Sequence, residues 1–367
     1  MALKRSTWPD GETVVVEHAS ALLADNPLGD PHLRRFPVWL PPGYSAATGG
    51  RKKRYPVLFD LTGYTGSGWS HTNWKNFEEN VPERLARLTH ERRLPGCIVV
   101  FPDCFTALGG NQYVNSSAIG AYADYLTREL IPFVDGAFRT LGERDHRGCF
   151  GKSSGGYGAL IHGMRYARYW GAVASHSGDA GFELCYQSGW PGTLTELGRY
   201  RRPQRKDGPV KIDTSTDALA EGCDDGRVRR FLDSVWQREN LSSAEIMALM
   251  NVCMAATYDP DPNAPNGFRL PYHLETGELI PARWRAWRRH DPVNLVRRRA
   301  GALKSLRGLY IDCGWRDQYH IHFGSRVLSR ELRRAGVAHH YEEFDGTHTG
   351  IDRRMDRSLP FLARALK

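Results

Sequence analysis

Short apolar runs alternate with helical patterns along most of the chain, and this alternation most constrains what the chain can fold into. The runs at 55–61 and 97–101 are almost continuously apolar, as is typical of strands covered on both faces. Strands alternating with helices predict an α/β protein with a mostly parallel, doubly wound sheet. Further strand patterns lie at 13–18, 35–40, 147–150, 170–175, 305–312 and 339–344, and helical patterns at 118–134, 155–165, 323–335 and 355–366.

The segment 181–289 breaks this alternation. It is rich in charged and turn residues, contains no good buried strand, and has helical patterns at 228–236 and 243–255. Because the strand pattern resumes after it, we interpret it as an insertion that forms a helical cap or lid over one end of the sheet. The core then comprises residues 1–180 and 290–367. A separate small domain is the alternative interpretation.

The five residues Gly151-Lys152-Ser153-Ser154-Gly155 lie between a strand pattern and a helical pattern. The sequence G-x-S-x-G is weak evidence alone, but a strand–turn–helix context is what a nucleophile elbow requires. We therefore predict that Ser153 is a catalytic nucleophile and that the backbone N–H of Ser154 binds an oxyanion. Ser154 is a rival nucleophile, and a glycine-rich turn with a solvated serine is the non-catalytic alternative.

A second oxyanion donor is expected from the loop at 60–68, which follows the strand pattern at 55–61. Its three glycines allow the backbone to turn an N–H group inward. The amide of Tyr64 is the first candidate and that of Gly63 the second. A flexible surface turn is the alternative.

Among fourteen histidines, His348 has the position expected of the general base, in a loop of small residues between the last strand pattern and the last helical pattern. His320 and His322 are its nearest competitors. They share a loop with the expected acid, whereas an elbow of this kind takes its base from a later loop.

The acid should follow the strand pattern at 305–312, because it must orient the imidazole and stabilise the imidazolium. Asp317 follows that pattern by a short loop and is the favoured candidate. Asp312 is a rival that lies within the strand pattern. Asp345 is another, although it could equally shape its own loop.

Composition limits the other classes of function. The net charge of +9 comes mostly from dispersed arginines, and no nucleic-acid-binding motif accompanies it. No apolar run approaches the length of a membrane helix, and the first ten residues lack the apolar core of a signal peptide, so we expect a cytoplasmic protein that binds no membrane. The seven cysteines have no metal-ligand spacing, so no metal site is expected.

Four stretches carry a resemblance to a known family: Leu61-Thr62-Gly63-Tyr64, the segment 151–159, Cys313-Gly314-Trp315-Arg316-Asp317 and Asp345-Gly346-Thr347-His348. With them the chain resembles the putative-esterase family of α/β-hydrolases, which includes esterase D, enterochelin esterases and feruloyl esterases. The segments 108–116 and 175–179 are most similar to the enterochelin-esterase-like branch. The resemblance covers about 35–180 and 290–367, and it implies an α/β-hydrolase fold, a Ser-Asp-His triad and no metal or organic cofactor.

We therefore expect a serine carboxylic ester hydrolase that forms an acyl-enzyme on Ser153 and acts on a small-molecule ester. Acyl transfer to a sugar or alcohol on the same triad is the alternative, and a non-catalytic binding module is a third hypothesis. No nucleic-acid partner is expected, and a homodimer stays open. The expected substrate-binding residues are Gly63, Gln112, Tyr113, His176 and Trp190.

Overall fold

The computed structural model describes residues 8–45, 53–202 and 224–367. Most of the N-terminal stretch considered for a signal peptide, together with Cys223, lies outside these ranges.

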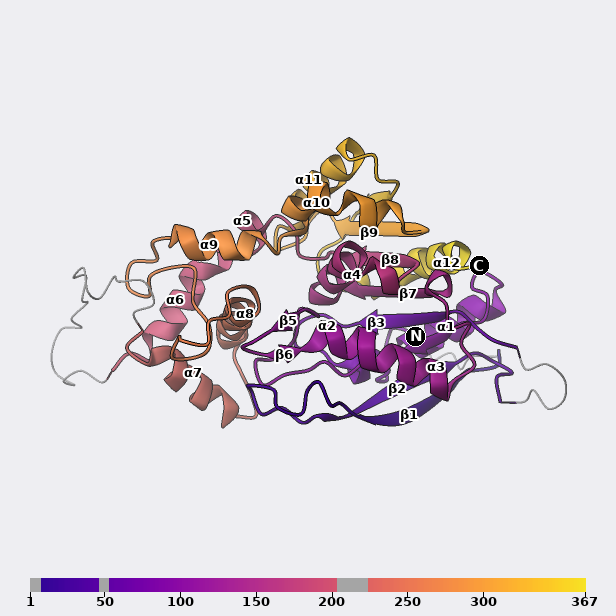
Figure 1. Ribbon diagram of the computed structural model, residues 1–367, viewed down its shortest axis with the longest axis horizontal. Helices are drawn as coiled ribbons and strands as arrows, with labels where there is room; N and C mark the ends of the chain where they lie inside the picture. The colour runs from indigo at the N-terminus through magenta and orange to yellow at the C-terminus, as the bar shows by residue number, and fades with distance from the viewer. Residues whose placement is uncertain (1–7, 46–52, 203–223) are drawn as a thin grey trace.

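An eight-stranded sheet forms the centre of the molecule (Figure 1), with the strand order β1-β2-β4-β3-β7-β8-β9-β10. β2 pairs antiparallel with both β1 and β4, whereas all neighbours from β4 to β10 pair parallel. Each strand overlaps one of the predicted runs, so the prediction of a mostly parallel sheet is confirmed. The strands are β1 (Glu12–Ala19), β2 (Leu33–Leu40), β3 (Val57–Leu61), β4 (Ile98–Val100), β7 (Arg147–Lys152), β8 (Ala172–His176), β9 (Gly308–Gly314) and β10 (His340–Phe344).

Helices cover both faces of the sheet because successive strand residues point to opposite sides. Leu58 of β3 packs in one apolar cluster with helices α1 (Val81–His90) and α12 (Met355–Ala365). Its neighbours Val57 and Phe59 belong to the larger cluster on the other face. That face is covered by α3 (Ile131–Ala137), α4 (Ser154–Arg165), α10 (Pro292–Lys304) and α11 (Ile321–Arg334).

The helix expected at 118–134 begins later than predicted. Gly120 has a φ of 146°, which no helix allows, and it lies in a small hairpin of β5 (Asn115–Ser116) and β6 (Gly120–Ala121). The helix starts after this hairpin as α2 (Tyr122–Asp124) and passes through a π-helical segment (Tyr125–Leu130) into α3.

The segment 181–289 contributes helices that lie together at the left of Figure 1. Both helical patterns expected in it are confirmed. Its aromatic side chains belong to the same apolar cluster as the strands, so its described part has no separate core. Beyond two isolated bridges, no strand occurs in that described part. Its helices are α5 (Phe182–Cys185), α6 (Trp190–Gly198), α7 (Arg227–Trp236), α8 (Ser243–Tyr258) and α9 (Pro281–Arg288).

None of the helices in the described ranges combines the length and the apolar character that crossing a bilayer requires.

Candidate active site

Ser153 lies on a sharp turn between β7, which ends at Lys152, and α4, which begins at Ser154. Its backbone is left-handed, with φ 54° and ψ −125°, a conformation that is strained for any residue with a Cβ. The turn fits only because glycines stand two residues before and two residues after Ser153: a Cβ on Gly155 would lie 1.8 Å from the carbonyl oxygen of Leu61. The Ser153 side chain stays partly exposed. The structure therefore places the predicted serine in the strand–turn–helix context of an elbow.

The loop after β3 lies directly beside this turn. A Cβ on Gly63 would be 3.3 Å from the Cβ of Ser153. The Tyr113 hydroxyl donates to the carbonyl oxygen of Thr62 at 2.7 Å, and the Tyr64 hydroxyl donates to that of Leu108 at 2.7 Å. These two bonds fix the loop on both sides of Gly63.

Two backbone N–H groups near Ser153 have no backbone acceptor among the described residues. Ser154 is the first residue of α4, so its N–H has no partner within the helix. Within the described ranges, the N–H of Tyr64 makes no backbone hydrogen bond, although the adjacent Thr65 N–H donates to Gly109 at 2.9 Å. Both groups therefore have the capacity to bind a ligand oxygen.

His348 is bonded to the favoured acid. Its Nδ1 lies 2.7 Å from Asp317 Oδ2, and Asp317 Oδ1 accepts a hydrogen bond from the Tyr319 N–H at 2.9 Å. Burial alone would raise the pKa of the Asp317 carboxyl, but the hydrogen bond and charge of His348 bring that pKa below its ordinary value. The rival Asp345 is exposed and pairs with Arg316 instead.

Ion pairs fasten the His348 loop to the elbow. Lys152, beside Ser153, lies 2.5 Å from Asp352, and Lys75 lies 2.5 Å from the other oxygen of the same carboxylate. No hydrogen bond joins Ser153 to His348 in the described structure. Catalytic hydrogen bonds are often long in ligand-free enzymes and shorten when substrate binds.

A second Asp–His pair lies beneath the elbow. His176 Nδ1 is 2.7 Å from Asp312 Oδ1, and His176 Nε2 is 2.8 Å from Ser358 Oγ. Asp312 also accepts a hydrogen bond from Arg354 at 2.8 Å. The His176 side chain is only 1% exposed. Because both ring nitrogens bond to buried protein groups, this geometry does not support the predicted contact of His176 with substrate.

Of the other expected pocket residues, one adjoins the elbow and two pack in the structure around the site. Gln112 Nε2 donates to Ser154 Oγ at 2.8 Å and to Asp179 Oδ2 at 3.3 Å, so this side chain adjoins the elbow. Tyr113 is buried beneath the loop after β3. Trp190 packs edge-on against Trp284 of α9, with ring centroids 5.3 Å apart.

Sequence reasoning missed the role of Asp179, whose side chain meets that of Tyr186 beside Gln112. The Tyr186 hydroxyl donates to Asp179 Oδ2 at 2.7 Å. Asp179 ends the stretch 175–179, which was considered only for its resemblance to other sequences. A carboxylate just after a buried strand was the available signal.

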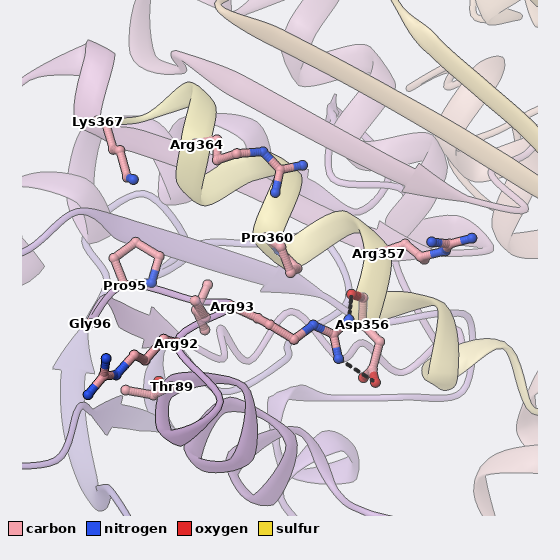
Figure 2. A pocket seen from close by; sticks show the side chains of 11 residues that line it. Thr89, Arg92, Arg93, Pro95, Gly96, Asp356, Arg357, Pro360, Arg364 and Lys367 are labelled. Atoms are coloured by element: carbon pink, nitrogen blue, oxygen red, sulfur yellow. Dashed lines mark hydrogen bonds and ion pairs between the residues drawn. The ribbon is translucent and has the colours of Figure 1, made fainter.

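A hollow of about 600 Å³ elsewhere on the described surface contains none of these residues. Figure 2 shows it between the end of α1 and α12, lined by Arg92, Arg93, Arg364 and Lys367. It adjoins the segment that enters β4, at the edge opposite to Ser153. Cations are favoured at helix C-termini, which explains this basic lining without a ligand.

Across the described ranges, no group of three or more His, Cys, Asp or Glu side chains is placed to hold a metal ion. The absence of a metal or organic cofactor stays a prediction.

Comparisons with known proteins indicate a family for the chain. A family model described as "Putative esterase" matches residues 31–352. Esterase Rv1288 of Mycobacterium tuberculosis (strain ATCC 25618 / H37Rv) is 32% identical over 149 residues, which are 39% of this chain and 28% of that protein. The uncharacterized protein YbbA of Bacillus subtilis (strain 168) is 24% identical over 168 residues, covering 41% of this chain and 58% of that protein. The matches therefore span less than two thirds of these curated relatives.

Solved structures show the fold. A ferulic acid esterase superposes with a TM-score of 0.57 at 18% identity, covering 98% of this chain and 99% of that one. An S-formylglutathione hydrolase (FrmB) from Staphylococcus aureus gives 0.54 at 14% identity, covering 97% and 100%. The predicted α/β-hydrolase fold is confirmed.

Proposed function

Because the chain belongs to the Putative esterase family, we propose that it hydrolyses carboxylic esters through an acyl-enzyme formed on Ser153. The observation that carries the proposal is the left-handed elbow between β7 and α4, which holds the serine side chain partly exposed. A turn strained in this way persists only where the surrounding structure enforces it, and such turns concentrate at functional sites.

In the proposed reaction Ser153 Oγ attacks the ester carbonyl while His348 Nε2 takes the hydroxyl proton. Asp317, at 2.7 Å from His348 Nδ1, holds the required tautomer and stabilises the imidazolium. The tetrahedral intermediate collapses, the C–O bond breaks, and His348 returns the proton to the leaving alcohol. Water then attacks the acyl-enzyme with the help of the same base, releasing the acid and regenerating Ser153.

The N–H groups of Tyr64 and Ser154 are the proposed oxyanion donors. They lie on the two segments that flank Ser153, and helix α4 directs its N-terminus at the site. Donors fixed before the reaction need no reorganisation as charge develops, and each is worth about 10²–10³ in rate.

The substrate class proposed is a small ester, as the structural neighbours named ferulic acid esterase and S-formylglutathione hydrolase suggest. We propose that 181–289 acts as the cap over this site. Its residues Tyr186, Met254 and Tyr258 support this role because they contact the polar network that includes Gln112 and Asp179.

The test is turnover of p-nitrophenyl acetate and butyrate, with and without an alcohol acceptor. Ser153→Ala should lower kcat/KM by at least about 10⁴-fold. Ser154→Ala retains the backbone amide and should lose far less, which separates the two serines. Ser188→Ala, at an exposed serine of the insertion, is the matched control. Equal activity of wild type and Ser153→Ala would overturn the proposal, and acceptor-dependent product would indicate acyl transfer.

A further inference from the structure

A buried chain of polar side chains connects the elbow with the insertion. It starts at Ser154 Oγ, which accepts from Gln112 Nε2 at 2.8 Å, and continues from Gln112 to Asp179 at 3.3 Å. The Tyr186 hydroxyl donates to Asp179 at 2.7 Å and lies 3.1 Å from the hydroxyl of Tyr258. All five side chains are buried.

Asp179 lies beside the proposed catalytic residues. It follows the end of β8, and the preceding Gly178 packs so closely against α4 that its Cβ would lie 2.6 Å from the backbone of Gly156. The charges of His348 and Asp317 both act on its carboxyl group. Asp179 is nevertheless only 6% exposed. The network thus adjoins the place where an ester must bind.

Two acceptor atoms of this network lack a donor among the described residues. Gln112 Oε1 is fully buried and has no hydrogen-bond partner there. The Gln112 amide nitrogen lies 3.0 Å from the sulfur of Met254, which accepts but cannot donate, so the amide is oriented with its oxygen away from that contact. Both hydrogen bonds to Asp179 reach Oδ2, and no described side chain donates to Oδ1. A buried acceptor left without a donor is costly, so Gln112 Oε1 calls for an explanation.

A hydroxyl group of a ligand suits this pair of acceptors. No described lysine or arginine forms an ion pair with Asp179, and burial raises the pKa of its carboxyl group. A hydroxyl has one proton and also accepts. It can donate that proton to Asp179 when the carboxylate is ionised, or accept from Asp179 and donate to Gln112 Oε1 when the carboxyl group is protonated. An ammonium group would bring its charge into this buried site, where only the ionised form of Asp179 pairs with it.

We propose that Gln112 and Asp179 bind a hydroxyl group of the ester substrate, so that hydroxylated esters react faster than matched esters without the hydroxyl. This specificity site rests on the proposed ester hydrolysis at Ser153. It assigns the insertion a share in specificity, because Tyr186 holds Asp179 in place.

The experiment compares kcat/KM within two substrate pairs, each corrected for its uncatalysed hydrolysis rate. Phenyl acetate and hydroxyphenyl acetate differ in the alcohol, whereas methyl butyrate and methyl 3-hydroxybutyrate differ in the acyl group. Wild type should prefer the hydroxylated ester at least about tenfold in one pair, since sites built to bond a hydroxyl reject analogues that lack it. Asp179→Ala and Gln112→Met should bring that ratio close to one, whatever their effect on the absolute rates.

Glu183→Gln is the matched control, because Glu183 is an exposed carboxylate of the same segment, paired with Arg288. It should leave the ratio unchanged. If Asp179→Ala does not fold by circular dichroism, Asp179→Asn preserves the size and should still lower the preference. The inference is overturned if wild type shows no preference in either pair or if the preference survives in the Asp179 variant. Loss of the proposed function itself would instead appear as ester turnover that Ser153→Ala leaves intact.

Discussion

Replacing Gly155 by alanine tests whether the elbow geometry controls the chemistry. The added Cβ would lie 1.8 Å from the carbonyl oxygen and 2.4 Å from the carbonyl carbon of Leu61. Both atoms are backbone at the end of β3, so no side chain can rotate away. To reach an ordinary contact of 3.4 Å, α4 and β3 must separate by about 1.6 Å.

That separation moves the two proposed oxyanion donors apart, because Tyr64 follows β3 and Ser154 begins α4. Misplacement of a reacting group by about 1 Å can cost about 10²-fold in rate. We therefore expect Gly155→Ala to lower kcat/KM for p-nitrophenyl acetate by about 10²–10³-fold. Overpacking should also lower the free energy of unfolding by about 1–3 kcal/mol.

Gly301→Ala is the matched control. Gly301 lies inside α10, has no atom within 4 Å of its added Cβ, and is remote in sequence from the elbow. Alanine there should raise the free energy of unfolding by about 0.5–1 kcal/mol, because it lowers the entropy of the unfolded chain. Its kcat/KM should match that of wild type. The reasoning fails if a folded Gly155→Ala variant retains kcat/KM within about threefold of the control, since the required shift predicts a far larger loss.

Further expectations concern the pairs around the site and one helix cap. Asp317→Asn should lower kcat by about 10³–10⁴-fold in single-turnover assays while the protein stays folded, because the amide cannot stabilise the imidazolium. Asp352→Asn should lower the free energy of unfolding by about 2–3 kcal/mol in urea titrations at pH 7. Burial opposes ionisation of Asp352, but Lys152 holds its pKa below the ordinary value, so this difference should shrink as pH falls from about 5 to 2. His176→Gln should lower the free energy of unfolding by about 3 kcal/mol in the same titration. It should lower kcat by less than about tenfold, whereas replacement of the proposed base His348 should lower kcat far more. Ser242→Ala removes the capping box of α8 and should cost about 1 kcal/mol of unfolding free energy by thermal denaturation, with unchanged kcat/KM.

The inner strands of the sheet could be predicted from sequence because they are buried on both faces and so appear as short apolar runs. The edge strands β1 and β10 are only partly buried, and alternation with helices was their main signal. The run 55–61 corresponds to β3 at Val57–Leu61, and 339–344 to β10 at His340–Phe344. Helix α1 was missed although its start carries a signal, since Asn80 and Glu83 form a capping box. The hairpin of β5 and β6 has two residues in each strand, too few for any periodicity.

Contacts between distant segments could not be predicted. Lys152 and Asp352 are 200 residues apart, and no local pattern links them. The same holds for Gln112 and Asp179, which come from loops after different strands and meet only once β4 and β8 lie in one sheet. His290 likewise contacts Arg165 from a distant segment; it is partly buried, and burial lowers its pKa to about 3.

Two of the Asp–His pairs show why a base cannot be identified from residue types alone. Asp312–His176 and Asp317–His348 have the same separation of 2.7 Å, and both acids belong to β9 or the loop directly after it. They differ in what surrounds the imidazole. The His176 ring is 1% exposed and its Nε2 bonds to Ser358, so it has no nitrogen left for a substrate proton. The His348 side chain is 13% exposed, and no described residue bonds to its Nε2. A general base needs one ring nitrogen oriented by a carboxylate and the other open to the reacting group, and that requirement favours His348 over His176.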